Sequence, residues 1–440
     1  MIAPTMLVIV LVGLGAAQGS KPDNVAAQAA QVTEFEVNGL KVLVKRRPSS
    51  PTVAAGLFIR GGARNINGKN AGIEALMLQS AIEAGKKYPK QAVRREVVGS
   101  GSGIGASASN DYSVVSLVAT RPNFDRIWDI FADVMINPVF APEDIERNRS
   151  ATLSGLRESE TSPDGALEAG IERFIYAGHP YANDVNGTVA TVGGLKAEDL
   201  VAYHKKVMQT SQLLLVFVGD LDANELKARI AASFGKLPRG EYKDQAFPAL
   251  NFSNATVDIV ARPNIPTNYV QGVFNAPAAN NADYYPMQVA MAILQGLIFE
   301  EVRVNRQLSY APGAEPNKFA ANTANISVSS VDANQSVEVM LEQVKAMRSQ
   351  FLTDEIVSQV AGNFLKTYYL AQETSMAQAG ELARYELTGG GWRNTYDFLK
   401  RVSEVKSADV NAVSNKYMKN IRFVVVGNPK AVNQSIFLQK

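Results

Sequence analysis

The chain has 440 residues, 46% of them hydrophobic and 20% charged, with a formal net charge of +2. This length predicts two to three globular domains, and the near-neutral charge argues against a nucleic-acid partner. The absence of cysteine excludes disulfides, a thiol nucleophile and thiolate metal sites. His179 and His204 are the only histidines and lie far apart, so no helix offers a pair of histidines to zinc.

The N-terminal residues resemble a secretory signal. An apolar run from Met6 to Leu14 is followed by small residues at 15–17, although no Lys or Arg precedes it. The run is too short for stable insertion in a membrane. We therefore expect a signal peptide over residues 1–19, a disordered spacer over 20–32, and a periplasmic protein.

Residues 33–240 have the pattern of an α+β domain. Two strands are expected within 35–44 around the Asn38-Gly39 turn, and the basic run Lys45-Arg46-Arg47 is interpreted as a solvated strand end. Alternation predicts a strand at 53–59 and one long strand over 104–120. Helical periodicity starts near Ala71. Further helices are expected at 124–135, 142–160, 166–176, 197–207 and 223–234, and another strand at 213–218.

Residues 241–252 are polar, contain a proline and have no periodicity, so we expect an interdomain linker there. A second α+β domain is expected over 253–440. Its strands are predicted at 256–261, 268–274 and 324–331, and its helices at 284–302, 336–351, 353–370, 377–387 and 393–402.

The end of the chain repeats a pattern of the first half. A helix that begins at Asp199 ends in Lys-x-Met and is followed by a strand that stops at Gly219; the same order recurs from Asp409 to Gly427. An internal duplication is the simplest explanation. The predicted fold is two homologous α/β-sandwich halves, each a mostly antiparallel sheet packed with helices, arranged as a clam shell.

Arg303 and Tyr310 are the first candidates for a functional site. They lie seven residues apart, close to two helical turns, so a continuous helix would place both on one face. A guanidinium beside a phenol hydroxyl is able to bind a carbonyl or an oxyanion. The alternative is a plain helix end with a solvated Arg and a half-buried Tyr.

The duplicated halves, this pair and a series of short segments resemble the pitrilysin-type zinc peptidases. Within that family the chain is most similar to the mitochondrial-processing-peptidase branch and its bacterial relatives. The resemblance runs from about Thr33 to the C-terminus. The segments that carry it, in order, are 39–42, 59–64, 70–72, 106–109, 138–140, 162–164 and 179–181.

The zinc motif of that family, His-x-x-Glu-His, is missing from the corresponding helix. The two histidine positions fall on Ala75 and Gln79, and the position of the catalytic Glu falls on Leu78. The third ligand, a Glu of a later helix, falls near Ser154 or Gly155. Glu74 is adjacent to Ala75, the first histidine position, but neighbouring helical residues point about 100° apart. It would also have no metal, so it cannot replace the catalytic base. The resemblance therefore implies no zinc in this chain and no peptidase activity of the chain alone.

The resemblance implies that this chain keeps the part of the peptidase site that contacts the substrate opposite the zinc. Arg303 and Tyr310 match an Arg and a Tyr that bind the substrate carbonyl and stabilise the oxyanion opposite the metal, whereas Arg306 is expected to form a structural ion pair or face solvent. Bacterial relatives of this kind act as heterodimers, so the implied partner is a homologous subunit that holds zinc, and the implied substrate is a peptide. The edge strand that would dock the peptide by β-augmentation contains Gly105, Ala106, Ser107 and Ala108.

Two other hypotheses remain open at this stage. In the first, the chain is a structural subunit like the core proteins of the respiratory cytochrome bc complex. In the second, it is a stand-alone protein that binds peptides without cutting them. The first predicts a membrane complex as partner, and in both Arg303 and Tyr310 have no role in proteolysis.

Overall fold

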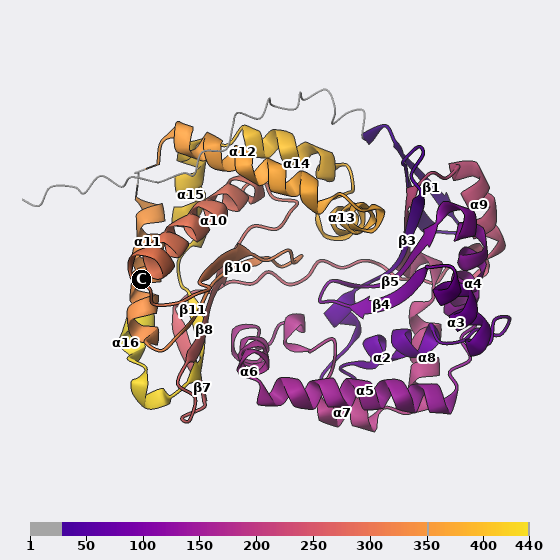
Figure 1. The fold of residues 1–440 in the computed structure, drawn as a ribbon, viewed down its shortest axis with the longest axis horizontal. Helices are drawn as coiled ribbons and strands as arrows, with labels where there is room; N and C mark the ends of the chain where they lie inside the picture. Colours follow the sequence, from indigo (N-terminus) through magenta and orange to yellow (C-terminus); the bar gives the residue numbers. More distant parts are fainter. Residues whose placement is uncertain (1–28, 350–351, 439–440) are drawn as a thin grey trace, which may run out of the picture.

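The computed structural model describes residues 29–349 and 352–438. The predicted signal peptide and most of the predicted spacer therefore lie outside the described residues. Figure 1 shows two lobes, each built on one sheet, with helices around and between the sheets. The predicted α+β fold of two sheets packed with helices is confirmed.

The first sheet has six strands in the order β1-β2-β6-β3-β5-β4, and only β2 and β6 are parallel. Asn38 (φ 50°) and Gly39 (φ 83°) make the predicted turn between β1 and β2, because both central residues of such a turn need positive φ. The strands are β1 (Val32–Val37), β2 (Leu40–Arg46), β3 (Thr52–Arg60), β4 (Gly103–Ala108), β5 (Tyr112–Thr120) and β6 (Leu213–Gly219).

The second sheet repeats this topology. Its order β7-β11-β8-β10-β9 matches β2-β6-β3-β5-β4, and again one pair, β7 with β11, is parallel. The helices before β6 and β11 begin alike, since Asp199 and Asp409 accept hydrogen bonds from the backbone N–H of Lys196 (2.8 Å) and Lys406 (3.0 Å). The strands are β7 (Thr256–Ala261), β8 (Asn268–Asn275), β9 (Gly313–Pro316), β10 (Thr323–Ser330) and β11 (Arg422–Gly427).

The helices follow the same duplicated order. In the first half they are α2 (Ile73–Ala81), α3 (Lys90–Gly99), α4 (Phe124–Ile136), α5 (Pro142–Thr161), α6 (Pro163–Gly170), α7 (Val189–Gly194), α8 (Ala197–Val207) and α9 (Ala223–Ala232). In the second half they are α10 (Tyr284–Ile298), α11 (Ala333–Arg348), α12 (Asp354–Ala371), α13 (Ser375–Thr388), α14 (Asn394–Ser403), α15 (Ser407–Tyr417) and α16 (Gln434–Phe437).

Each half places a helix against the sheet of the other half. Strand side chains alternate between two faces, and in the first sheet one face packs on helices of its own half around Trp128. The opposite face packs on α13, where Leu382 is 1% exposed. In the same way α6 packs on β7, β8 and β11 of the second sheet. Figure 1 shows α6 and α13 between the lobes. The two halves therefore share apolar cores.

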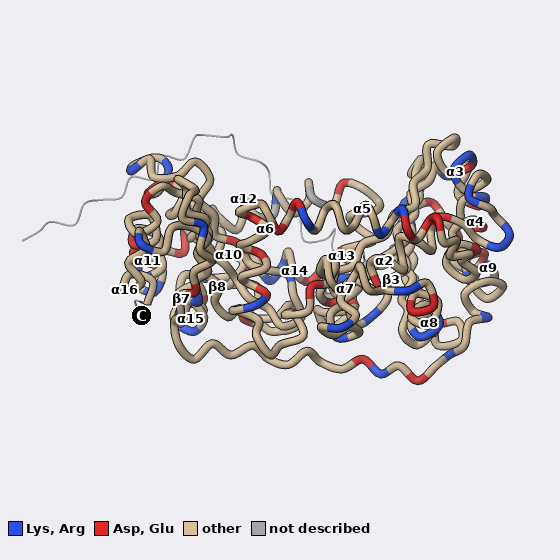
Figure 2. Tube along the Cα trace, turned by 90° about the horizontal axis from the view of Figure 1, so that it is seen from below, with Lys and Arg blue, Asp and Glu red and all other residues tan. Residues whose placement is uncertain are grey.

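Residues 237–255 connect the halves without a helix or strand. Figure 2 shows this segment extended along one side of the molecule. Phe247, Leu250 and Phe252 pack in a cluster with side chains of both halves, and Pro248 O lies 3.0 Å from Nε2 of His179. The linker is thus packed against both halves. The boundaries of the linker at 241–252 stay a prediction.

Three predictions of secondary structure were wrong. The expected strand over 104–120 is a hairpin, because Ser109 N–H bonds back to Tyr112 O (3.0 Å) and separates β4 from β5. The expected helix to residue 302 ends as α10 at Ile298 and continues as a π-helical segment, η7 (Phe299–Asn305). The expected helix over 166–176 likewise ends as α6 at Gly170 and continues as a π-helical segment. Helices α3, α7 and α16 and strand β9 were not predicted.

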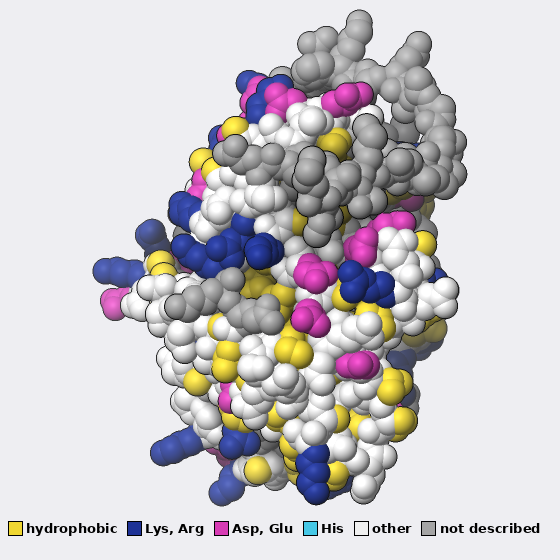
Figure 3. Space-filling view, turned by 90° about the vertical axis from the view of Figure 1, so that its left-hand side faces the viewer, with side chains coloured by type: hydrophobic (Ala, Val, Ile, Leu, Met, Phe, Trp, Pro, Cys, Tyr) yellow, Lys and Arg dark blue, Asp and Glu magenta, His cyan; other side chains and the backbone are white. Residues whose placement is uncertain are grey.

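The run Lys45-Arg46-Arg47 is also only partly a solvated strand end. Lys45 is 6% exposed, because strand alternation points it at the helices of the second half, together with Lys41 and Leu43. Figure 3 shows one face of the molecule with acidic and basic side chains intermixed. Among the described residues no helix is long and apolar enough to cross a membrane.

Candidate functional site: an Arg/Tyr pair and a cavity between the two halves

Arg303 and Tyr310 are in contact, although they do not share a helix. Gln307 has a φ of 55°, which ends the helical path and turns the chain back. The guanidinium carbon of Arg303 lies 4.0 Å from the centroid of the Tyr310 ring and 5.0 Å from that of Phe299. Such stacking is a cation–π interaction. Tyr310 is 79% exposed, so its hydroxyl is accessible to a ligand.

The loop that carries Tyr310 is fastened to the second sheet. Ser309 Oγ donates a hydrogen bond to Ser329 O (2.8 Å), and Ser330 Oγ donates one to Leu308 O (3.0 Å). The backbone N–H of Leu308 also bonds to Val302 O (2.8 Å). These bonds hold the ring over Arg303 while its hydroxyl stays in solvent.

Arg306 differs from Arg303 in its partners. It forms ion pairs with Glu301 (3.5 Å) and Glu342 (3.4 Å), which confirms the predicted structural role. Arg303 has no carboxylate partner within the described ranges and keeps its charge available. The two arginines of one turn thus have different roles in the structure.

Strand β4 lies at the edge of the first sheet and pairs only with β5. The predicted edge strand, with Gly105, Ala106, Ser107 and Ala108, is therefore an edge in the structure. Its side chains are half-buried or exposed, and its free backbone groups are able to add a strand. Peptide docking at this edge stays a prediction.

The positions of the lost zinc motif lie beside a large cavity. Gln79 of α2 and Gly155 of α5 line a space of about 1030 Å³ that also contacts β7 of the second half. Gly155 faces open space, whereas Ser154 is not part of the lining, so Gly155 is the better match to the third ligand. Ala75 and Leu78 are buried in α2. Arg303, Tyr310 and β4 do not line this cavity.

The donor set at these positions does not fit zinc. Ala75 and Gly155 offer no side-chain ligand, and Gln79 offers only an amide, whereas zinc prefers imidazole, thiolate or carboxylate. No cluster of three His, Asp or Glu suited to a metal occurs in the described part of the chain. His179 and His204 bond instead to backbone carbonyls of Pro248 (3.0 Å) and Met135 (2.8 Å).

Glu74 points away from the cavity, as predicted. Its carboxylate is buried and accepts hydrogen bonds from Ser113 Oγ, from Tyr203 OH (2.5 Å) and from Asn65 Nδ2 (3.3 Å). Burial raises the pKa of Glu74, and these three hydrogen bonds oppose that rise. The side chain is a buried structural acid rather than a substitute base.

Rebuilding the ligand set tests these assignments. We expect the triple variant Ala75→His, Gln79→His and Gly155→Glu to retain about one zinc per chain after dialysis, because the two histidines lie at i and i+4 of one helix and Gly155 faces open space. Metal analysis of the dialysed protein measures this. The wild type is expected to retain no zinc, and the double variant without Gly155→Glu is expected to retain less zinc than the triple variant. A folded triple variant without zinc would show that the positions are misassigned.

Acidic side chains line the same cavity. Glu172, in the π-helical segment η3 (Ile171–Ile175), lies there with Glu168 and Asp184. Burial raises the pKa of Glu172 to about 8, and the charges of Asp184 and Glu168 add to the shift. The folded protein therefore disfavours the ionised carboxylate, and stability is lost as the pH rises from the unfolded pKa through about 8.

Glu172→Gln is expected to remove this pH dependence. At pH 5 the variant and the wild type should have similar free energies of unfolding, and at pH 9 the variant should be more stable by about 2 kcal/mol after allowance for solvent screening. Urea unfolding at a series of pH values measures the difference. Glu158→Gln, an exposed glutamate outside the cavity, is the control. Equal curves for the wild type and Glu172→Gln would contradict the assignment.

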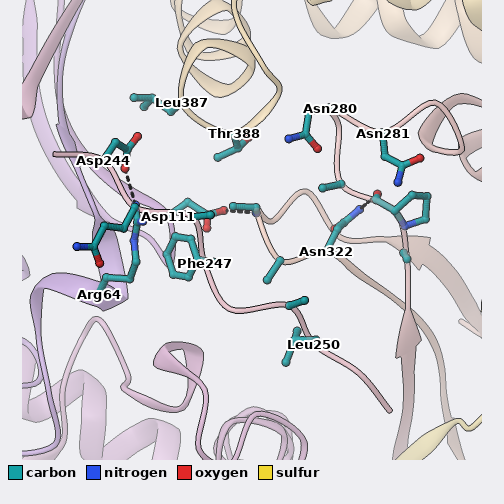
Figure 4. Close-up of a pocket in the computed structure, with 18 of the residues that line it drawn as sticks. Arg64, Asp111, Asp244, Phe247, Leu250, Asn280, Asn281, Asn322, Leu387 and Thr388 are labelled. Carbon is teal, nitrogen blue, oxygen red and sulfur yellow. Dashed lines mark hydrogen bonds and ion pairs between the residues drawn. The ribbon is translucent and has the colours of Figure 1, made fainter. Parts of the chain in front are cut away.

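A second cavity, of about 530 Å³, lies where the linker meets loops of both halves (Figure 4). Arg64 pairs there with Asp244 (2.8 Å) and stacks on Phe247 (4.1 Å). Asp111 accepts hydrogen bonds from Tyr181 OH (2.6 Å) and from the N–H of Ala320 (3.0 Å) of the second half. Burial raises the pKa of Asp111 to about 6. No predicted site residue lies here, since only folding brings these segments together.

The protein is thus a two-lobed α+β structure, and the positions that the resemblance assigns to zinc ligands hold Ala75, Gln79 and Gly155. Comparison with family models gives the family itself: residues 41–189 match the insulinase model of peptidase family M16, and residues 194–363 match the model described as the peptidase M16 inactive domain. The chain belongs to peptidase family M16. The match to the inactive domain accords with a chain that lacks catalytic activity.

The relatives in sequence carry different names: a zinc protease, a processing-peptidase subunit and a subunit of the cytochrome b-c1 complex. An uncharacterized zinc protease of Rickettsia felis is 21% identical over 89% of this chain and 96% of its own. The beta subunit of the yeast mitochondrial-processing peptidase is 20% identical over 92% of both chains. Subunit 1 of the bovine cytochrome b-c1 complex is 25% identical over 60% of this chain and 55% of its own.

Solved structures show the same fold. The peptidase M16 inactive domain from Pseudomonas fluorescens superposes with a TM-score of 0.81 at 19% identity, covering 92% of this chain and 99% of that one. A chain of complex III2 from Candida albicans has a TM-score of 0.80 at 16% identity, covering 92% and 98%. At this identity the likeness concerns the fold alone.

Proposed function

We propose that this chain is the non-catalytic subunit of a heterodimeric zinc metallopeptidase. It supplies Arg303 and Tyr310 to a homologous partner, which supplies zinc and the catalytic base. The pair binds the carbonyl of a peptide substrate and stabilises the oxyanion that forms at the partner's metal. The edge strand β4 docks the peptide, and the N-terminal run directs the protein to the periplasm.

One observation carries this proposal: Arg303 has no carboxylate partner among the described residues and lies beside an exposed Tyr310, while Arg306 in the same turn is paired with two glutamates. In a purely structural protein we would expect both Arg303 and Arg306 to be buried or paired with carboxylates. The absent zinc ligands at Ala75, Gln79 and Gly155 support a division of the site between two chains. The similarity to a processing-peptidase subunit supports a paired assembly.

Co-expression with a homologue that has an intact His-x-x-Glu-His motif tests the proposal. We expect a one-to-one complex by size exclusion with light scattering, and cleavage of peptides by the complex but by neither chain alone. Cell fractionation with and without residues 1–19 tests export. A complex that forms but cleaves nothing, or no complex at all, would contradict the proposal.

A structural role in a membrane complex is the second candidate. The likeness to bovine cytochrome b-c1 subunit 1 and to a chain of Candida albicans complex III2 favours it. It predicts that the chain purifies with a membrane fraction and that substitutions at Arg303 have no effect on peptide cleavage.

A further inference from the structure

A small polar cavity of about 250 Å³ lies between the two halves, apart from the sites described above. Strand β2 of the first half forms one wall, and α12, α13, α14 and the α12–α13 turn of the second half form the others, at the junction visible in Figure 1. No Asp or Glu of the described residues lines it. The side chains that define its chemistry are Lys45, Arg47, Gln372, Gln378, Thr395 and Tyr396.

Lys45 is a buried cation without a counter-ion. Its Nζ has no carboxylate partner among the described residues and lies 5.4 Å from the Tyr396 ring centroid. Lys41, on the same face of the same strand, pairs with Glu34 (3.1 Å) and Glu386 (2.6 Å). A buried charge is normally paired because its desolvation is costly. The comparison with Lys41 shows that pairing is possible on this face, and Lys45 lacks it.

Three side chains around Lys45 have buried polar atoms without a hydrogen-bond partner among the described residues. Such atoms are rare in native proteins, so three in one cavity point to a polar ligand. Thr395 is 3% exposed and Tyr396 7% exposed. The unpaired atoms are Gln378 Oε1, Thr395 Oγ1 and Tyr396 OH.

The hydrogen-bonding capacity of the cavity selects the ligand. Lys45, Arg47 and the two hydroxyls are able to donate hydrogen bonds, and two of these groups are cationic, so the ligand is an anion with several oxygen acceptors. Gln378 Oε1 is an acceptor, since its amide nitrogen already donates to Gln372 O (2.9 Å). The ligand therefore also carries a proton to donate. Hydrogen phosphate has both properties, whereas sulfate has no proton at neutral pH.

We propose that this cavity is a binding site for a small protonated oxyanion of the phosphate type, which bridges the two halves of the chain. The anion neutralises Lys45 and Arg47 and satisfies the hydroxyls of Thr395 and Tyr396. Because β2 and α14 belong to different halves, binding stabilises their junction.

Protonation of Lys45 couples binding to pH. Burial lowers the pKa of Lys45 to about 8, with the charge of Arg47 as the second cause. The other titratable groups that line the cavity are Tyr368, Tyr369 and Tyr396, and burial raises the pKa of Tyr368 and of Tyr396. The Lys45 charge is therefore lost above about pH 8, and anion binding weakens there.

Titration calorimetry of the full chain with sodium phosphate at pH 7 tests the proposal. We expect one site per chain, with affinity lowered about tenfold or more by Lys45→Met and by Tyr396→Phe. Lys400→Met, an exposed lysine on the same helix as Tyr396, should change it less than about twofold. Wild-type affinity should fall severalfold at pH 9.5, and Lys45→Met should lose most of that dependence.

Parallel titrations identify the source of the anion. Binding of phosphate in preference to sulfate supports the protonated oxyanion, and tighter binding of glycerol phosphate than of phosphate would contradict it, because at pH 7 a phosphate monoester is mainly the dianion without a proton on its phosphate group. Absence of binding at 10 mM phosphate would overturn the proposal. Equal loss of affinity in Lys45→Met and Lys400→Met would overturn it as well, since binding would then be a general effect of charge.

Discussion

Arg303→Ala is expected to lower kcat/KM of the proposed heterodimer about 100- to 1000-fold. Removal of one oxyanion donor has an effect of this size in other acyl-transfer enzymes. The loss should lie mainly in kcat, because the guanidinium acts on charge that develops in the transition state. Steady-state kinetics on a fluorogenic peptide, with the complex purified at one-to-one stoichiometry, measures it.

Two further variants separate the roles of the residues in this turn. Tyr310→Phe keeps the ring over Arg303 and removes only the hydroxyl, so a smaller loss, about tenfold, is expected. Arg306→Ala removes an equal charge that is already paired with Glu301 and Glu342, and should leave kcat/KM within about twofold. Similar losses in Arg303→Ala and Arg306→Ala would mean that the turn acts only through folding or general charge. Unchanged kinetics in Arg303→Ala would favour the structural role.

The features that depend on local pattern were predictable from the sequence. The Asn38-Gly39 turn, the helix that begins near Ala71 and the repeated segment at Asp199 and Asp409 all follow from short-range rules of turns, periodicity and capping. The positions compared with zinc ligands, on α2 and α5, come from the family resemblance and stay a prediction. Contact between Arg303 and Tyr310 was expected, but through a continuous helix. The structure achieves it through a turn at Gln307, which no periodicity indicates.

Features that join distant segments were not predictable. The continuous apolar run of β6 shows that both faces of this strand are buried, yet nothing local identifies α13 as the helix on its second face. The same contact buries Lys45, which sequence alone places at an exposed strand end. Asp111 becomes significant only when Tyr181 and Ala320 meet it. In each case the local sequence does not identify the segment of the other half that contacts the residue.

The shared cores lead to the second large effect: Leu382→Ala is expected to lower the free energy of unfolding by about 2–5 kcal/mol. Leu382 is 1% exposed and belongs to the cluster that includes Leu43, Phe58 and Leu214 of the first sheet. Its truncation leaves a cavity between two elements that the chain brings together from a long distance in sequence. Urea unfolding followed by circular dichroism measures the change.

Leu370→Ala is the matched control, because Leu370 on α12 is 62% exposed and the same truncation should cost less than about 0.5 kcal/mol. Hydrogen exchange then shows where stability is lost. If α13 supports the first sheet, amides of β3 and β6 should exchange faster in Leu382→Ala, although both strands lie more than 160 residues away in sequence. Faster exchange confined to α13 and α14 would mean that the helix rests on the sheet without stabilising it. The two halves would then be separate folding units, and an anion bound at Lys45 would have little effect on the stability of the first sheet.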